Sequence, residues 1–356
     1  MVATCPSDNT VAVDQETFWD GNWDAHKIGW IISGAAAAVT LGISLITIIG
    51  HGRNYHRPNQ QRQIIRILLF APVFAIISFF SYRFFRDYTY YELIEVVWEA
   101  VAIAAFLILI LNYIGEDEGQ QRNVLAKKDK KKLPLPFCCF RYRPSKAYYL
   151  VVIKWGVVQY CFVRPALSIA GIVLQYYNLL CESSLSYKYG YVYILAVDFT
   201  SISIALYALI VLYALIREDL KGRRPLAKFL SVKAAIFLTF YQSFIFSFLQ
   251  DKGVIKATEY WTATNVSDGL SALCTSLEMV LVAAFQVWAF NWREYKEIGR
   301  QMASSQHDGL DPKKVKIKHT NPLYAILHAL WPGDLFVELW HSMRFAYDRM
   351  RGKEYT

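Results

Sequence analysis

Long apolar runs alternate with short polar segments along most of the chain. Seven runs are long enough to cross a bilayer core of about 30 Å as a helix, and they cover residues 27–49, 64–85, 92–114, 149–177, 190–216, 229–250 and 268–291. The pattern therefore predicts an all-α, polytopic membrane protein. Its transmembrane domain of seven helices covers residues 27–291, with an N-terminal segment, residues 1–26, before it and a C-terminal tail, residues 292–356, after it.

Lys and Arg are distributed unevenly between the segments that connect the predicted helices. Alternate segments hold 28 of them on one side and five on the other, and residues 1–26 hold none. Because cytosolic loops are enriched in Lys and Arg, we expect an external or lumenal N-terminus and a cytosolic tail. The hydrophobic share of 55% and the net charge of +9 fit a basic surface against anionic lipid, so we expect no nucleic-acid partner.

Short motifs follow the order of the predicted helices. They are His51 to Arg66 (HGRNYHRPNQQRQIIR), Pro72, Trp98-Glu99-Ala100, Gly115-Glu116, Lys154 to Tyr160, Arg164-Pro165, Pro225 to Leu230 and Glu278-Met279. On these motifs the chain resembles the organic solute transporter alpha-subunit family, and within it the transmembrane protein 184 type. Trp98 stands where the family usually has Tyr, and Gln286 stands where it often has His. The tail resembles that of fungal members.

This resemblance implies a seven-helix membrane protein related to facilitated carriers of steroid-type and other organic anions. We expect no cofactor, and we expect bound lipid or sterol. The candidate partners are membrane lipids and a single-span partner subunit or a second copy of the chain. Fungal relatives are associated with the vacuolar membrane, so vacuolar or endosomal membranes and the plasma membrane are the candidate locations.

Ionisable residues inside the predicted spans are candidates for a solute cavity. Arg164 and Glu278 each lie near the middle of a span, where charge is costly and usually faces the bundle interior. Glu92, Glu95 and Glu99 share one helical stripe. The candidate cavity residues are Arg164, Glu278, Glu99, Asp198, Gln159, Gln242, Lys233, Ser168 and Thr275. Either Arg164 binds an anionic group there, or buried pairs such as Arg164 with Glu278 or Glu99 hold the helices in register.

The segment between the first two predicted spans forms a candidate cytosolic mouth. Its polar residues are His51, Asn54, Tyr55, Gln61 and Arg62. In one interpretation these side chains bind a headgroup or gate the cavity. In the other they cap and pack the two helices.

Cysteines and one sequon mark candidate modification sites. Cys138 and Cys139 lie among apolar and basic residues in the longest predicted cytosolic loop, which suits palmitoylation, although two reduced, packed thiols are the alternative. Cys5 and Cys181 are both predicted external and are candidates for a disulfide. Asn265 begins an N-x-S sequon in a predicted external loop and is a candidate glycosylation site. We expect no metal site.

The tail turns amphipathic after Asn321, which predicts one or two helices that lie on the membrane. Phe336 and Leu339 form an aromatic-x-x-aliphatic step beside acids, a pattern that resembles motifs binding the ubiquitin-like autophagy modifier. The alternative for these two residues is surface packing.

Two functions remain after other classes are set aside. No predicted span contains a His, and no H-E-x-x-H motif occurs, so we expect no enzyme. A carrier of organic anions, steroids or lipid-like amphipathic solutes is the first interpretation. A non-transporting vacuolar or endosomal scaffold that recruits cytosolic partners through its tail is the second.

Overall fold

The computed structural model of the chain is helical in almost all of its regular elements. It describes residues 25–84, 88–115, 117–128, 130–134, 139, 141–144, 147–177, 179–180, 186–217, 225–256, 261, 263–306 and 320–331, and positions 333, 334, 337, 340, 344 and 351. The helices are α1 (Ala25–Arg53), α2 (Pro58–Leu68), α3 (Phe70–Arg83), α4 (Tyr88–Ile114), α5 (Glu118–Ala126), α6 (Ala147–Tyr176), α7 (Gly190–Ile216), α8 (Pro225–Asp251), α9 (Ala263–Ala289), α10 (Arg293–Gln306) and α11 (Pro322–Leu330). The strands β1 (Lys131–Lys132) and β2 (Arg141–Tyr142) form a short antiparallel pair.

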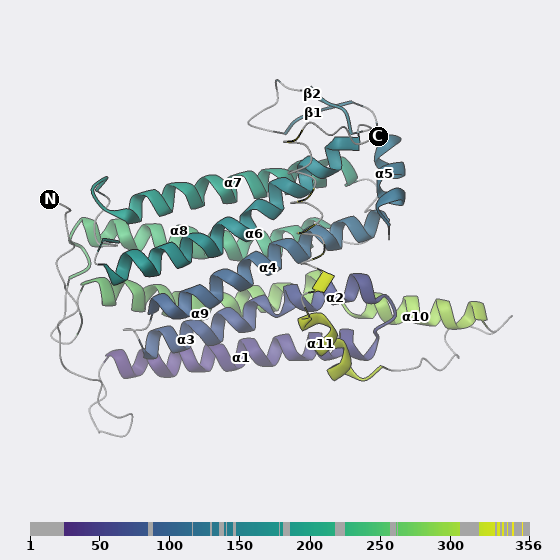
Figure 1. Cartoon of the computed structure of the whole chain (residues 1–356). Helices are drawn as coiled ribbons and strands as arrows, with labels where there is room; N and C mark the ends of the chain where they lie inside the picture. Colours follow the sequence, from purple (N-terminus) through teal and green to yellow (C-terminus); the bar gives the residue numbers. More distant parts are fainter. Residues whose placement is uncertain are drawn as a thin grey trace.

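The long helices run side by side as one bundle (Figure 1). Within the described part of the chain, six helical segments are long and apolar enough to cross a membrane. They are His26–Arg53, Pro58–Arg83, Tyr90–Ile114, Tyr149–Tyr176, Gly190–Ile216 and Asn265–Ser305. The all-α, polytopic membrane architecture is therefore confirmed. The predicted span 229–250 corresponds to α8, which lies alongside the others but is not among the six, so seven spans stay a prediction.

The second candidate span is divided into α2 and α3 at Leu69. Pro72 has no backbone N–H to donate to the carbonyl of Leu68. The helical series of backbone hydrogen bonds is therefore interrupted at Leu68, one turn before the proline. The backbone of Leu69 keeps helical angles, and the chain continues in the same direction. Pro165 has no such effect on the assignment of α6, which runs from Ala147 to Tyr176 without a break.

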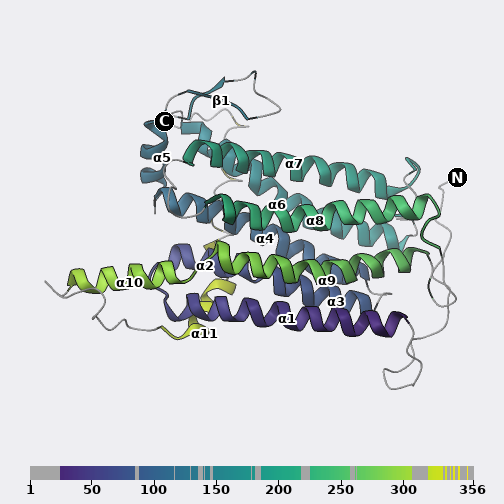
Figure 2. The ribbon, with the colours of Figure 1, turned by 180° about the vertical axis from the view of Figure 1, so that it is seen from behind.

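Helix α9 lies at the centre of one half of the bundle, between α1 and α8 (Figure 2). Helix α4 joins this half to the α6–α7 pair, because it packs against both α3 and α6. The Oγ atoms of Ser33 and Ser276 lie 2.8 Å apart where α1 meets α9. Large apolar side chains face outward, such as Ile46 at 70% and Leu281 at 71% exposure, as lipid-facing positions do.

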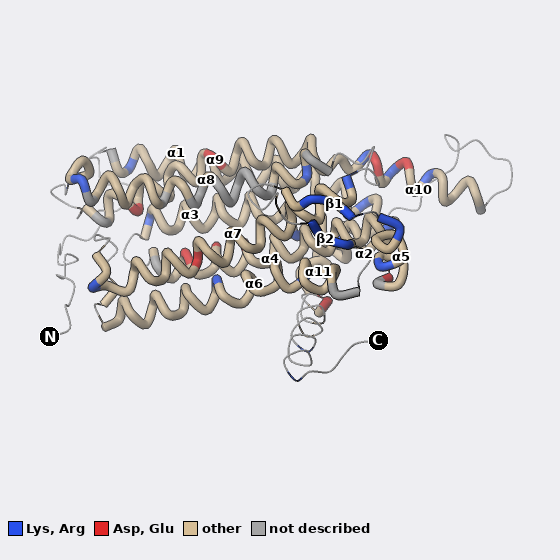
Figure 3. Tube along the Cα trace, turned by 90° about the horizontal axis from the view of Figure 1, so that it is seen from above, with Lys and Arg blue, Asp and Glu red and all other residues tan. Residues whose placement is uncertain are grey.

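Lys and Arg gather at one end of the bundle, around α2, α5, β1 and β2 (Figure 3). Helix α10 extends beyond the bundle at the same end (Figure 1). The uneven distribution of charge that the sequence predicts is thus a property of the folded molecule. We call this region the basic end.

Candidate functional site

A polar cavity of about 150 Å³ lies among α3, α4, α6, α7, α8 and α9. Tyr88 at the start of α4 and Tyr191 at the start of α7 line it, so it lies in the half of the bundle opposite the basic end. The polar and ionisable residues that line it are Tyr88, Glu92, Glu95, Glu99, Tyr160, Arg164, Ser168, Tyr191, Asp198, Ser271 and Thr275.

Arg164 lies between two carboxylates that come from different helices. Its Nη1 atom is 3.2 Å from Asp198 Oδ2 on α7, and its Nε atom is 3.8 Å from Glu99 Oε2 on α4. Tyr160, one turn before Arg164, donates a 2.7 Å hydrogen bond to Glu99 Oε1. The side chains of Asp198 and Glu99 are only 5% and 9% exposed, against 21% for Arg164. These contacts tie α4, α6 and α7 together around one guanidinium.

Two further carboxyl groups, Glu92 and Glu95, share the cavity. They lie on the same stripe of α4 as Glu99, and Ser78 Oγ on α3 donates a 2.8 Å hydrogen bond to Glu95 Oε1. The cavity lining thus has four acidic side chains and one basic one. An anionic group that reaches Arg164 meets a guanidinium that is already engaged, and it has to compete with carboxylates for it.

Five of the nine candidate cavity residues line this space together, and they are Arg164, Glu99, Asp198, Ser168 and Thr275. The amide of Gln159 instead bonds α6 to α7, where it donates to the Ser201 carbonyl at 2.8 Å and accepts from Ser201 Oγ at 2.7 Å. The side chain of Lys233 lies outside the described residues.

Glu278 is not brought to Arg164. It lines a separate groove of about 370 Å³ on α8 and α9, together with Gln242 and Cys274. Gln242 also donates from Nε2 to the Ser271 carbonyl at 2.6 Å. Within the described part of the chain, Glu278 Oε2 and Gln242 Oε1 are buried without a hydrogen-bond partner.

The candidate mouth residues connect α1 and α2 through hydrogen bonds to the backbone. Gln61 Nε2 donates to the carbonyls of His51 at 3.2 Å and Asn54 at 2.6 Å, and its Oε1 accepts from the backbone N–H of Arg57 at 2.9 Å. His51 Nε2 lies 3.0 Å from the Phe290 carbonyl at the end of α9. These contacts are those of helix capping and packing.

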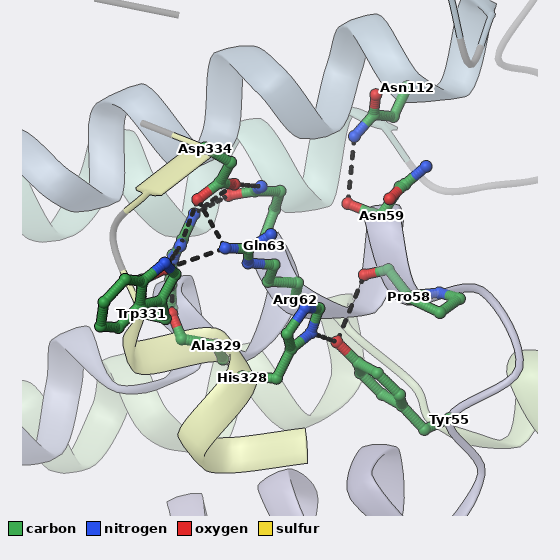
Figure 4. A network of polar contacts seen from close by, with 11 residues as sticks. Tyr55, Pro58, Asn59, Arg62, Gln63, Asn112, His328, Ala329, Trp331 and Asp334 are labelled. Carbon is green, nitrogen blue, oxygen red and sulfur yellow. Dashed lines mark hydrogen bonds and ion pairs between the residues drawn. The ribbon is translucent and has the colours of Figure 1, made fainter. Parts of the chain in front are cut away.

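The tail covers this mouth. Helix α11 packs against α1 and α2, with Ala325 and Ala329 fully buried. Arg62 Nη2 donates to the carbonyl of Trp331 at 2.9 Å, and the Tyr55 hydroxyl lies 2.9 Å from His328 Nδ1 (Figure 4). The start of the tail after Asn321 is therefore docked on the bundle, whereas its sequence predicts a helix lying on the membrane.

Charge stabilises this docking. Burial alone would raise the pKa of Asp334, but the hydrogen bond and charge of Arg66, with Gln63 and Arg62, hold that pKa below its usual value. Burial, followed by the charge of Arg62, lowers the pKa of His328. A neutral imidazole can accept a hydrogen bond from the Tyr55 hydroxyl, and burial raises the pKa of Tyr55 to about 12, which keeps this hydroxyl protonated as the donor.

The predicted modification sites Cys5, Cys138 and Cys181 fall outside the described residues, and so do the tail-motif residues Phe336 and Leu339. Cys139 is a free and exposed thiol. The loop position predicted for Asn265 is wrong, because α9 begins at Ala263, and the Asn265 side chain is only 5% exposed. Glycosylation of Asn265 stays a prediction.

The most extensive contact that sequence reasoning missed joins Arg66 to Asp334. The two residues are 268 positions apart, and no periodicity links them. The signal that could have pointed to it is Arg66 itself, a basic residue in an apolar span, where a buried charge requires a partner. Glu92 and Glu95 were visible as a stripe with Glu99, but their partner Ser78 was not.

Comparison with known proteins places the chain in a family. Residues 29–295 match the family model described as organic solute transporter Ostalpha. A relative from Dictyostelium discoideum, a transmembrane protein 184 homologue, is 27% identical over 256 residues, which cover 71% of this chain and 50% of the relative. The chain thus spans about half the length of that curated relative. No solved structure matches. The matched family consists of transporter-type membrane proteins and is not an enzyme family. The chain is a member of this organic solute transporter alpha and transmembrane protein 184 family.

Proposed function

We propose that this protein is a carrier that moves amphipathic organic anions, such as steroid sulfates, through the cavity around Arg164. The observation that carries the proposal is a guanidinium inside a membrane bundle, in a cavity of about 150 Å³, held by carboxylates from two other helices. Intramembrane charges of this kind commonly mark a solute pathway. The cavity also contacts six helices, so small shifts among them change its shape.

The charges of the cavity suggest how binding and release alternate. A solute anion competes with Asp198 and Glu99 for Arg164, and it binds when one of these carboxylates moves away or takes up a proton. When the carboxylate returns to Arg164, the anion is released. Uptake is therefore expected to increase when the solution on the cavity side becomes more acidic.

In this proposal α8 is the seventh crossing and the basic end faces the cytosol. The cavity then lies in the external or lumenal half of the bundle. Vacuolar or endosomal membranes and the plasma membrane remain the candidate locations.

Uptake of a radiolabelled steroid sulfate into proteoliposomes tests the proposal. We expect Arg164→Lys, which loses the planar guanidinium, to lower uptake by about tenfold or more, as loss of a charge-assisted hydrogen bond does. Asp198→Asn should weaken the dependence on acid. Lys127→Gln, which removes one exposed charge at the basic end, is the control. Uptake by wild type no greater than that of empty liposomes, or full uptake by Arg164→Lys, contradicts the proposal.

Recruitment of cytosolic partners is the second candidate, because the outer face of α11 is apolar and exposed. Leu323, Tyr324 and Leu327 are each about three-fifths exposed. Phe336→Ala with Leu339→Ala should abolish capture of the purified autophagy modifier if the tail recruits it. These substitutions are preferable to removal of the tail, because its loss would also leave Arg66 without most of its partners.

A further inference from the structure

Arg66 lies in the last turn of α2 and is almost completely buried, at 1% exposure. Its Nε atom donates to the Ala329 carbonyl at 2.7 Å, and Nη2 donates to the Trp331 carbonyl at 2.7 Å. Nη1 donates to Gln63 Oε1 at 2.8 Å. The remaining two donors hold the carboxylate of Asp334, at 2.8 Å and 2.6 Å. All five guanidinium donors are thus used, four of them by the tail.

The carboxylate of Asp334 occupies a cradle built by α2. Besides the two bonds from Arg66, it accepts from Gln63 Nε2 at 2.6 Å and lies 3.0 Å from Arg62 Nη2 (Figure 4). Two guanidinium groups and one amide therefore surround a single anion. Within the part of the chain that the structure describes, Arg62 Nε is buried without a hydrogen-bond partner, so the Arg62 guanidinium has a donor that Asp334 does not use.

The shape and charge of this cradle suit a larger anion than a carboxylate. Guanidinium groups match carboxylate and phosphate equally in bidentate geometry. A phosphomonoester has three acceptor oxygens and a charge of about −1.5 to −2 at pH 7, against two oxygens and −1 for Asp334. It can therefore engage the donors that Asp334 uses and the spare Nε of Arg62 as well.

The position of the cradle suits a lipid headgroup. It lies on α2, which begins at Pro58, where Arg62 and Arg66 stand four residues apart on one face of the helix. It is also at the basic end, where Lys and Arg gather on neighbouring elements (Figure 3). Anionic lipid is enriched in the leaflet that basic ends face.

The apolar contacts that hold α11 on the bundle are limited. Helix α11 has only nine residues, and helices of that length are not stable alone in water. Its fully buried residues are two alanines, Ala325 and Ala329, and Ile326 packs against the core only partly buried, so α11 buries little apolar area. Asp334 is 25% exposed, so solution and headgroups can reach it.

We propose that Arg62, Gln63 and Arg66 form a binding site for a phosphate group, which Asp334 of the tail occupies as an internal substitute. A phosphomonoester on an anionic lipid competes with Asp334, and its binding releases α11 from α1 and α2. The tail then becomes available on the cytosolic side only where such a lipid is present. This proposal is independent of whether the protein transports a solute.

Hydrogen exchange of peptides from residues 322–331 measures tail docking in the full-length protein. The protein is reconstituted in nanodiscs of phosphatidylcholine, with or without a phosphatidylinositol monophosphate. A third sample contains the soluble inositol phosphate with phosphatidylcholine alone. Peptides from α9 report whether the bundle itself stays folded. We expect the phosphorylated lipid to accelerate exchange in residues 322–331 by about tenfold and to leave α9 unchanged. If the soluble headgroup acts equally well, the site is a phosphate site that does not need the membrane.

Substitutions distinguish phosphate binding in the cradle from a general attraction of anions to the basic end. Asp334→Asn should accelerate exchange of the tail without any lipid, and Asp117→Asn, an exposed acid at the same end, should not. Arg62→Gln should abolish most of the lipid effect, whereas Lys127→Gln should keep it. The proposal is overturned if Asp334→Asn frees the tail but neither phosphate compound does, or if Arg62→Gln responds to the lipid like wild type.

Discussion

Tyr160 and Glu99 show how charge is held in the cavity at the level of single residues. The Tyr160 side chain is fully buried, and its hydroxyl donates to one oxygen of Glu99 at 2.7 Å while Arg164 lies near the other. A carboxylate inside a membrane bundle needs such donors, because no bulk water replaces them. The hydroxyl therefore helps to fix Glu99 in place beside Arg164.

Removal of that hydroxyl tests its contribution. Tyr160→Phe keeps the ring and leaves one Glu99 oxygen without its donor, so we expect a loss of about 1–3 kcal/mol in the free energy of unfolding. Thermal unfolding in detergent, followed by intrinsic fluorescence, measures this. Tyr176→Phe is the matched control, because Tyr176 is 82% exposed. Equal midpoints for the two variants would show that Tyr160 does not stabilise Glu99.

The residues of the cavity were partly predictable. The spacing of Glu92, Glu95 and Glu99 fixes them on one stripe of a helix whatever the surroundings. The partner of Arg164 was not predictable, because the acids of several spans occupy similar depths and the pattern of one helix does not say which other helix it faces. Because α6 packs against α7, Arg164 pairs with Asp198. Glu278 on α9 lines a separate groove instead.

At the level of elements, Gln61 joins the end of α1 to the start of α2. The last carbonyls of a helix have no partner within it, and Gln61 Nε2 donates to two carbonyls in this turn, those of His51 and Asn54. Its Oε1 accepts the backbone N–H of Arg57 just before α2. One buried amide thus satisfies three backbone groups and fixes the angle between the two helices.

Gln61→Ala removes these three bonds at once. We expect the free energy of unfolding to fall by about 2–4 kcal/mol, since each buried backbone group left unpaired costs about 1 kcal/mol or more. Exchange of amides in residues 51–57 should accelerate more than exchange in α6. The control is Gln175→Ala, an exposed amide on α6. If both variants unfold at the same temperature, the turn is held mainly by other contacts.

The predicted spans and the observed helices agree closely because the length and hydrophobicity of a span are local properties. The predicted span 190–216 coincides with α7. The hydropathy pattern predicts the start of the second span at residue 64, whereas the helix begins at Pro58. The difference arises because Gln60, Gln61 and Gln63 lower the hydropathy but are buried by neighbours. Burial of polar residues depends on the assembled bundle, so the hydropathy of one segment cannot predict it.

At the level of the whole molecule, the two ends of the bundle differ. The cavity around Arg164 lies in one half, and the docked tail closes the other end over α1 and α2. Between them, Ile64, Ile65 and Leu68 are fully buried or nearly so. The structure therefore holds a polar cavity toward one end and, at the other, a packed region in which Arg62 and Arg66 hold Asp334.

Tail docking is expected to depend on pH through His328 and Asp334. The pKa of each group is lowered in the folded protein, below 6.5 for His328 and below 3.8 for Asp334. A group with a depressed pKa contributes stability that is present above its unfolded pKa and is lost as pH falls through the folded value. Docking should therefore be constant above about pH 6.5 and weaken in two steps on acidification.

The first step comes from His328, because its protonation removes the acceptor for Tyr55 and places a positive charge near Arg62 and Arg66. The second step, below about pH 4, comes from Asp334 as its carboxylate loses its charge. Hydrogen exchange of residues 322–331, corrected for the intrinsic effect of pH, measures both. His328→Asn should abolish the first step and keep the second, because an uncharged amide cannot repel the two arginines at any pH. A first step that persists unchanged in His328→Asn would show that another group controls it, and docking that stays constant down to about pH 3 would show that the charge of Asp334 does not hold the tail.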